Sequence, residues 1–482
     1  MPQTLYDSAF LDKNYVTNYY NVYKFDEDHY LITTDHAAWV VLSKEEYDLL
    51  RLERVEEDPN LYRSLKEVGI ILTNDNIKDV IKLYAERNHF LFRGPSLHIV
   101  VPTLRCNQKC IYCHSSVEPS NAKGYDMDEE TAKAIVDFIF KSPTKTLCIE
   151  FQGGDCLLNF SIVEFIIDYA KDVAKKKKKK VVFNLVTNLT LMNEDIVKSL
   201  SKRKIMGIST SLDGPKHIHD KTRKYLNGRG SYDDVVYWIK RIKDEWKYHF
   251  NLNALCTVTK YSLPYVKEMV DEYISLGFNR IFLRPLNNIG FAKKTWNKIG
   301  YTPEEYLVFW KEGIEYIIKQ NVEGKEIHEF MSVIFLKKIL QKYDPLFVDI
   351  QSPCGAGIGQ LLYTYNGDIH TCDEGKIFPE FKLGNVKTSR YTDIFKNKTL
   401  ISMIDISSRQ NYLCDNCPWN PYCGICPIYT YAAQGSVVSK LSMDDKCKIY
   451  KEIIRTLFQK LIFSRDDRKI LLEWVKKDTI LT

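Results

Sequence analysis

The stretch LHIVVPTLRCNQKCIYC (residues 97–113) decides the fold, because an apolar strand leads directly into a loop that carries three cysteines. Their spacing, Cys106-x3-Cys110-x2-Cys113, lets each thiol turn toward one metal centre with little backbone strain. A structural zinc ion would need a fourth protein ligand, and the one candidate nearby in sequence is His114. Because His114 follows Cys113 directly, the two side chains are poorly placed to bind the same ion. A 4Fe–4S cluster normally takes four cysteines, so three would leave one iron open to an exogenous ligand.

Apolar runs that resemble buried parallel strands extend outward from this stretch. The six predicted strands cover residues 97–103, 146–152, 181–187, 205–212, 252–258 and 280–286. Amphipathic stretches such as 127–141 and 159–176 separate them and have helical spacing. This alternation predicts βαβ units with right-handed crossovers, and six units form a partial, TIM-like (β/α)6 barrel. Chemistry in such folds gathers at the carboxyl ends of the strands, where the cysteine loop lies.

The segments that flank this α/β core differ in pattern. HYLITTDHAAWVVLSKEEYDLL (29–50) predicts two short strands and a helix, and LYRSLKEVGIIL (61–72) predicts a helix and a further strand. Together they indicate a small α+β module that resembles a winged helix. The predicted division is an N-terminal module at 1–95, a core at 96–290, a helical bridge at 291–350, a cysteine-rich domain at 351–450 and a C-terminal helix at 451–482.

Length, charge and composition narrow the classes of protein to which the chain can belong. A chain of 482 residues suggests about three domains, and its net charge of +6 comes without the basic stripe of a nucleic-acid-binding protein. No apolar run is long enough to span a membrane, and the start MPQTLYDSAF lacks the features of a signal peptide. We therefore expect a cytoplasmic protein, in which 13 cysteines indicate metal or cluster ligands and not disulfides.

With Tyr112 before the last cysteine, the loop reads C-x3-C-x-aromatic-C at the end of the first strand of a βα repeat. It resembles the signature of the radical S-adenosylmethionine (SAM) superfamily. The resemblance implies that SAM completes the cluster through its amino nitrogen and carboxylate. It also implies reductive cleavage of SAM to methionine and a 5′-deoxyadenosyl radical, which takes a hydrogen atom from the substrate. A zinc loop remains the alternative.

Three further segments resemble the SAM pocket of this superfamily: FQGGDC (151–156), VTNLT (186–190) and STSLDGPKHIHDKTRKYLNGRGSY (209–232). The glycines of the first would let backbone approach the ligand, and Asp155 would accept from its amino group. Most relatives have Glu followed by Pro where this chain has Asp155 and Cys156. Asp213 and Gly214 fit a plain turn as well as a ligand contact. The implied cofactor-binding residues are Tyr112, Gly153, Gly154, Asp155, Asn188, Ser211 and Arg223.

Seven further cysteines follow in the last third of the chain, with CDNCPWNPYCGIC (414–426) as the densest stretch. The pattern resembles the SPASM domain, which carries two auxiliary iron–sulfur clusters. The resemblance assigns one cluster to Cys414, Cys417, Cys423 and Cys447, and the other to Cys354, Cys372 and Cys426. The second set lacks a fourth cysteine, so its last iron is open or takes another ligand, and Asp373 and Glu374 are close in sequence. A zinc ribbon is the alternative. The three cysteines left over are interpreted as small buried hydrophobes: Cys148, Cys156 and Cys256.

A SPASM tail implies a peptidyl substrate, and residues 1–95 resemble a truncated precursor-peptide recognition domain. A structural appendage without a role in peptide binding is the alternative for these residues. Over most of residues 30–450 the chain resembles the His-Xaa-Ser system peptide maturases. The matching stretches are LHIVVPTLRCNQKCIYC, IEFQGGDCLLNF, STSLDGPKHIHD and IFLRPLNNIGFA. This resemblance implies an oxidoreductase that forms a carbon–carbon, ether or thioether cross-link in a ribosomally made peptide.

A cross-link is a two-electron oxidation, of which hydrogen abstraction removes one electron, so the auxiliary clusters are candidate acceptors for the other. The expected partners are the precursor peptide and a reductant such as flavodoxin or ferredoxin, with neither nucleic acid nor a membrane. Two alternatives remain open. One is a sulfatase maturase, which oxidises Cys or Ser of a protein to formylglycine, and the other is a zinc-stabilised peptide-binding scaffold without SAM chemistry.

Overall fold

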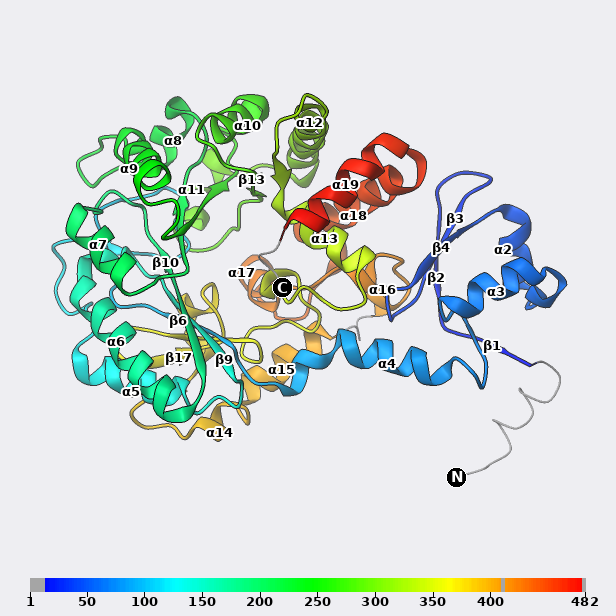
Figure 1. Cartoon of the computed structure of the whole chain (residues 1–482), viewed down its shortest axis with the longest axis horizontal. Helices are drawn as coiled ribbons and strands as arrows, with labels where there is room; N and C mark the ends of the chain where they lie inside the picture. Colours follow the sequence, from blue (N-terminus) through cyan, green and yellow to red (C-terminus); the bar gives the residue numbers. More distant parts are fainter. Residues whose placement is uncertain (1–13, 409–411, 479–482) are drawn as a thin grey trace.

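The computed structural model describes residues 14–408 and 412–478. One nine-stranded sheet, ordered β14-β12-β11-β10-β9-β6-β16-β17-β18, organises the core (Figure 1). Its first six strands run parallel, as the partial (β/α)6 barrel predicts. They are β6 (Leu97–Val100), β9 (Thr146–Phe151), β10 (Lys180–Val186), β11 (Gly207–Ser211), β12 (Asn251–Thr257) and β14 (Leu283–Arg284).

The prediction of one strand over residues 280–286 was wrong. The chain instead forms β13 (Arg280–Ile281), which pairs with β15 (His328–Glu329), and then β14, which pairs with β12. Between them Phe282 leaves both ladders, and its carbonyl lies 2.9 Å from the Cys256 thiol. The Glu329 carboxylate then accepts from the backbone N–H of Leu283 at 3.2 Å. These two contacts satisfy the backbone at the point where the strand changes partner.

Helices cover the outer face of the parallel strands. The predicted helix at 159–176 is α6 (Phe160–Lys177), which buries an apolar stripe at i, i+3 and i+4 spacing. The one predicted at 127–141 is α5 (Glu129–Ile139), which begins where Asp128 accepts from the backbone N–H of Thr131. The other helices of this layer are α7 (Glu194–Lys202), α8 (Lys216–Thr222), α9 (Tyr232–Glu245) and α10 (Val266–Ser275).

The cysteine-rich segment continues the same sheet, which its sequence does not predict. β16 (Gln360–Tyr363) pairs in parallel with β6, and β17 (Asp368–His370) and β18 (Lys382–Asn385) follow it antiparallel. Gly367, at a φ of +83°, makes the turn between β16 and β17. Cys372 therefore comes directly after a strand of the core sheet.

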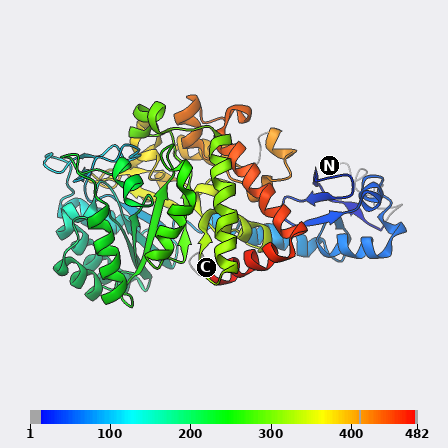
Figure 2. The ribbon, with the colours of Figure 1, turned by 90° about the horizontal axis from the view of Figure 1, so that it is seen from above.

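The N-terminal module lies at one end of the elongated molecule (Figure 2). Its antiparallel sheet, β2-β3-β4, packs with two helices around an apolar cluster of its own. The predicted strands and helices at 29–50 and 61–72 are present, and β1, β2 and α4 are additional. The elements are β1 (Val16–Thr17), β2 (Asn21–Lys24), β3 (Tyr30–Thr33), β4 (Trp39–Leu42), α2 (Lys44–Arg51), α3 (Pro59–Glu67), β5 (Ile71–Leu72) and α4 (Ile77–Arg87).

Helices also join the core to the end of the chain. The amphipathic C-terminal stretch forms two helices and not one, because the Ser464 side chain accepts from the backbone N–H of Asp467 and starts a new helix. Within the described ranges, no helix is both long and apolar enough to cross a membrane. The helices are α11 (Phe291–Ile299), α12 (Pro303–Val322), α13 (Phe330–Leu340), α15 (Lys398–Ser407), α16 (Tyr412–Asp415), α17 (Pro427–Gln434), α18 (Asp445–Phe463) and α19 (Arg465–Lys477).

Candidate functional site

The first three cysteines lie in the loop between β6 and α5, at the carboxyl edge of the parallel sheet. Cys106 and Cys110 are buried, and Cys113 is half-buried. Burial raises the pKa of the Cys106 thiol, and negative charge on Asp155, Cys110 and Cys113 would raise it further. Burial also raises the pKa of the Cys110 thiol, to about 12. The loop thus brings three buried or half-buried thiols together, and a bound cluster would release their protons.

Two of the predicted cofactor-binding residues, Tyr112 and Arg223, contact each other behind this loop. The Arg223 guanidinium donates to the Tyr112 hydroxyl at 2.9 Å, and that hydroxyl lies 2.7 Å from the Asp213 carboxylate. Asp213 also accepts from the Thr222 hydroxyl at 2.6 Å, and Arg223 donates to the Gln108 amide oxygen at 3.3 Å. Asp213 is therefore a buried anchor of the loop and not a plain turn residue.

A second buried carboxylate, Asp155, joins the ends of neighbouring strands. It accepts from the Thr187 hydroxyl at 2.9 Å, from the Asn188 backbone N–H at 2.9 Å and from the Leu157 backbone N–H at 3.1 Å. Burial raises the pKa of the Asp155 carboxyl, and these donors oppose the shift. The Asn188 side chain lies 3.8 Å from the Cys106 sulfur. Asp155 and Asn188 thus lie beside the cysteine loop.

Close approach of two backbone segments explains the glycines of FQGGDC. A Cβ on Gly153 would lie 2.3 Å from the Thr103 carbonyl oxygen, and one on Gly154 would lie 2.1 Å from that of Arg105. The Gly154 N–H donates to the Thr103 carbonyl at 3.0 Å. Glycine is therefore required at both positions because the backbone that follows β6 lies too close to leave room for a side chain. Ser211 ends β11 at the same edge of the sheet.

Cys354, Cys372 and Cys426 meet in one apolar cluster with Ile289 and Phe381. Burial raises the pKa of the Cys372 thiol, and Asp373, Cys426, Glu374 and Cys354 raise it further through their charges. The three cysteines come from three separate segments, which the sheet extension and α17 bring together.

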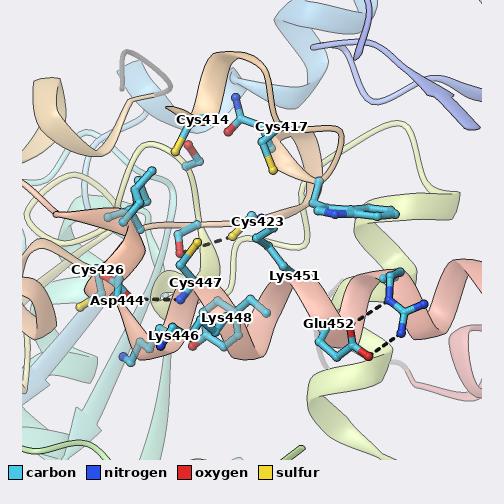
Figure 3. A pocket seen from close by; sticks show the side chains of 18 of the residues that line it. Cys414, Cys417, Cys423, Cys426, Asp444, Lys446, Cys447, Lys448, Lys451 and Glu452 are labelled. Carbon is cyan, nitrogen blue, oxygen red and sulfur yellow. Dashed lines mark hydrogen bonds and ion pairs between the residues drawn. The ribbon is translucent and has the colours of Figure 1, made fainter. Parts of the chain in front are cut away.

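The other four tail cysteines line a cavity of about 890 Å³. In Figure 3 the sulfurs of Cys414, Cys417, Cys423 and Cys447 face a common space, whereas that of Cys426 points away from it. The backbone N–H of Cys447, in the first turn of α18, donates to the Asp444 carboxylate at 3.0 Å. The tail thus divides into a group of three and a group of four.

Distant parts of the chain hold the loop that carries this group of four. The Thr33 hydroxyl donates to the Pro418 carbonyl at 2.9 Å, and the Tyr19 hydroxyl donates to the Asp415 carbonyl at 2.9 Å. Two buried cations act in the same way, because Arg87 donates to the Pro421 carbonyl at 3.1 Å and Lys338 to the Cys423 carbonyl at 3.2 Å. Sequence reasoning missed these contacts.

The donor set fits iron–sulfur clusters, because ten thiols form groups of three, three and four. Throughout 14–408 and 412–478, no three His, Cys, Asp or Glu side chains are arranged to bind a single metal ion. The leftover cysteines lie within or beside strands: Cys156 and Cys256 are fully buried and Cys148 is half-buried.

Comparison with known proteins supports the presence of iron–sulfur clusters. Residues 100–262 match the radical SAM superfamily, and residues 354–418 match the iron–sulfur cluster-binding SPASM domain. The chain is 32% identical to an uncharacterized protein of Methanocaldococcus jannaschii, MJ0907, over 43% of this chain and 72% of that protein. It is 26% identical to a cysteine-type anaerobic sulfatase-maturating enzyme of Clostridium perfringens, over 76% of this chain and 97% of that enzyme.

Two solved structures share the fold. Native anSMEcpe with bound AdoMet and the Cp18Cys peptide matches with a TM-score of 0.65 at 22% identity, over 79% of this chain and 100% of that one. Streptococcus suis SuiB bound to its precursor peptide SuiA matches with a TM-score of 0.54 at 15% identity, over 89% of this chain and 98% of that one. SAM and 4Fe–4S clusters follow from the matched domains. The chain therefore belongs to the radical SAM superfamily, as an enzyme whose tail is a SPASM domain.

Proposed function

We propose that the enzyme modifies a ribosomally synthesised peptide and forms a carbon–carbon, ether or thioether cross-link within it. The observation that carries the proposal is the N-terminal module, which contacts the loop of an auxiliary cysteine group through Thr33 and Tyr19. The SuiB structure matches 89% of this chain, against 79% for anSMEcpe. SuiB binds a precursor peptide, which supports the same class of substrate here.

The module offers a means of holding such a peptide. In the three-stranded sheet, β2 and β4 are the outer strands, and each pairs on one side only within the described chain. An extended leader segment could add to one of these edges as a further strand, with its main-chain hydrogen bonds supplying affinity. The modified segment would then reach the carboxyl edge of the core sheet.

At that edge we assign the cluster that binds SAM to Cys106, Cys110 and Cys113. SAM bound there supplies a 5′-deoxyadenosyl radical, which takes hydrogen from the substrate. Tyr112, Asp213 and Arg223 fix the cysteine loop through their hydrogen bonds. We further assign Gly153, Gly154, Asp155, Asn188 and Ser211 to the SAM pocket, because they line the same strand ends.

The two groups of tail cysteines would provide an acceptor for the second electron of the oxidation. Abstraction of hydrogen removes one electron from the peptide, bond formation with loss of a proton releases the second, and an auxiliary cluster would accept it. A low-potential reductant such as flavodoxin or ferredoxin would supply the electron that cleaves SAM. We place the enzyme in the cytoplasm, where thiols stay reduced.

The second candidate is a sulfatase-maturase activity, which the 26% identity over nearly the whole Clostridium perfringens enzyme favours. The products separate the two. A cross-link removes two hydrogen atoms from the peptide, whereas formylglycine formation from cysteine removes the sulfur and adds oxygen.

Mass spectrometry of candidate peptides tests the proposal. The anaerobically reconstituted enzyme is incubated with SAM, dithionite and either a candidate precursor peptide, sought among short reading frames beside its gene, or a cysteine-type sulfatase peptide. Loss of two hydrogens from the first, and no change in the second, is the expected result. Formylglycine in the second peptide alone would favour the maturase. Zinc in place of iron, with no SAM cleavage, would leave a binding scaffold.

A further inference from the structure

A buried carboxylate lies beside the tail site that has only three cysteines. The Glu374 side chain is 6% exposed, and its Oε2 lies 3.8 Å from the Cys426 sulfur. Its other oxygen, Oε1, accepts from the Asn287 amide and lies 3.5 Å from the Arg284 guanidinium. Asn287 therefore holds Oε1, while Oε2 accepts from the thiol of a cysteine of the site.

We propose that Glu374 is the fourth protein ligand of the auxiliary cluster held by Cys354, Cys372 and Cys426, and binds iron through Oε2. This inference rests on the assignment of those cysteines, and it is independent of the peptide substrate.

The arrangement separates the two acids that follow Cys372. Asp373 turns the other way, with its Oδ2 3.7 Å from the His114 imidazole beside the SAM loop. Of the two acids, Glu374 is the one with a hydrogen-bond contact to a sulfur of the three-cysteine group, 3.8 Å from Cys426. The structure thus favours one of two candidates that are adjacent in sequence.

Charge balance favours coordination over a bystander role. Three thiolates and a carboxylate in a buried site repel one another, so they stay ionised together only where a cation lies among them. In the described part of the chain, the cation within ion-pair distance of Glu374 is Arg284, at 3.5 Å. Arg284 is shared, since it pairs with Asp349 at 3.0 Å. A cluster iron would supply the missing positive charge directly at Oε2.

The ligand can be tested in a full-length background in which Cys106, Cys110 and Cys113 are all alanine, so that only the auxiliary clusters remain. Glu374→Ala and Glu374→Gln are compared with the background protein after anaerobic reconstitution and brief controlled oxidation. We expect each to lose roughly one iron per chain and to show the EPR signal of a three-iron cluster, because a non-thiolate position left without its ligand releases its iron. Asp349→Asn is the matched control. It also changes a partner of Arg284, and it should retain all its iron.

Glu374→Cys gives a second, independent readout. It should keep the four-iron cluster and shift the midpoint potential to a lower value, because a thiolate donates more charge to iron than a carboxylate does. The proposal is overturned if iron count, EPR spectrum and potential are the same in all Glu374 variants, or if added cyanide already binds the auxiliary iron of the background protein. A Cys372→Ala protein with unchanged iron would instead refute the cysteine assignment.

Discussion

The two cysteine regions of this enzyme are built in opposite ways. In the SAM loop the three thiols are contained within eight consecutive residues (106–113), at the end of one strand. In the tail, seven cysteines come from 354–447 and meet only because β16 joins the core sheet and α18 returns across it. A site built from neighbours in sequence depends on its own loop, whereas a site built from distant segments depends on the whole fold. This difference predicts how each region responds to mutation.

The largest expected effect concerns SAM cleavage. Cys106→Ala should abolish 5′-deoxyadenosine formation and keep the fold, because the loop is anchored by Tyr112 and Asp213 and not by the cluster alone. Cys447→Ala should still cleave SAM but make no peptide product. The measurement is 5′-deoxyadenosine by chromatography, with circular dichroism as a check on folding. Cys148→Ala, in a strand, is the control and should behave as wild type. SAM cleavage by Cys106→Ala would refute the assignment.

Next in size is the buried anchor of the SAM loop. Asp213→Ala removes the carboxylate that reaches the buried Arg223 guanidinium through the Tyr112 hydroxyl and that accepts from the Thr222 hydroxyl, and we expect a loss of about 3–5 kcal/mol in the free energy of unfolding. Tyr112→Phe removes a hydroxyl but keeps both charges, so about 1–2 kcal/mol is expected. Urea unfolding measures both. Equal losses of unfolding free energy in the two variants would show that the Asp213 charge is not the main anchor.

The glycine contact comes third. Gly154→Ala forces a Cβ against the Arg105 carbonyl and should cost about 1–3 kcal/mol, with a matching loss of SAM affinity as the cysteine loop shifts. Gly228→Ala is a useful comparison, because Gly228 has a φ of +87° but nothing within 4 Å of a new Cβ. It should cost about 1 kcal/mol and leave SAM binding unchanged. A harmless Gly154→Ala would contradict the close approach.

The tail should respond to a change made far away in the N-terminal module. Thr33→Val removes the hydrogen bond to Pro418 and should cost about 1 kcal/mol, with faster iron loss from the group of four. The control is Thr17→Val in the same module, since the buried Thr17 hydroxyl has no hydrogen-bond partner among residues 14–408 and 412–478. Iron release to a chelator over time is the readout. Identical iron release from both variants would show that the Thr33 hydrogen bond does not help to hold the cluster loop.

The smallest effect is a pH dependence on α18, the helix that carries Cys447. Arg455, followed by Lys311, lowers the pKa of Glu452 to about 2. Because the folded pKa is depressed, the stabilisation is present above the unfolded value of about 4.3 and is lost as the pH falls toward 2. Partial exposure limits it to under about 1 kcal/mol. Glu452→Gln should be less stable than wild type near pH 7, and the difference should shrink at about pH 3.

These contrasts also explain what the sequence could predict. The parallel strands depend on local apolar runs, and the predicted fold class was confirmed. The cysteine loop depends on local spacing, and the assignment of its three cysteines to a cluster stays a prediction. The pairing of β16 with β6 places Gln360 opposite Leu97. Because these residues are far apart in the chain, no local sequence pattern predicts their pairing. The buried cations Arg87 and Lys338 were missed because lysine and arginine on amphipathic helices usually face solvent. Asp213 was visible in its motif, but its role depends on contacts with Tyr112 and Thr222.

One measurement tests the central claim most directly: iron and sulfide content of the anaerobically reconstituted enzyme, followed by 5′-deoxyadenosine formation from SAM with dithionite. Three cysteine groups predict about twelve irons per chain together with SAM cleavage. Roughly four irons per chain with SAM cleavage would show that the tail cysteines hold no auxiliary clusters. Bound zinc without SAM cleavage would contradict it altogether.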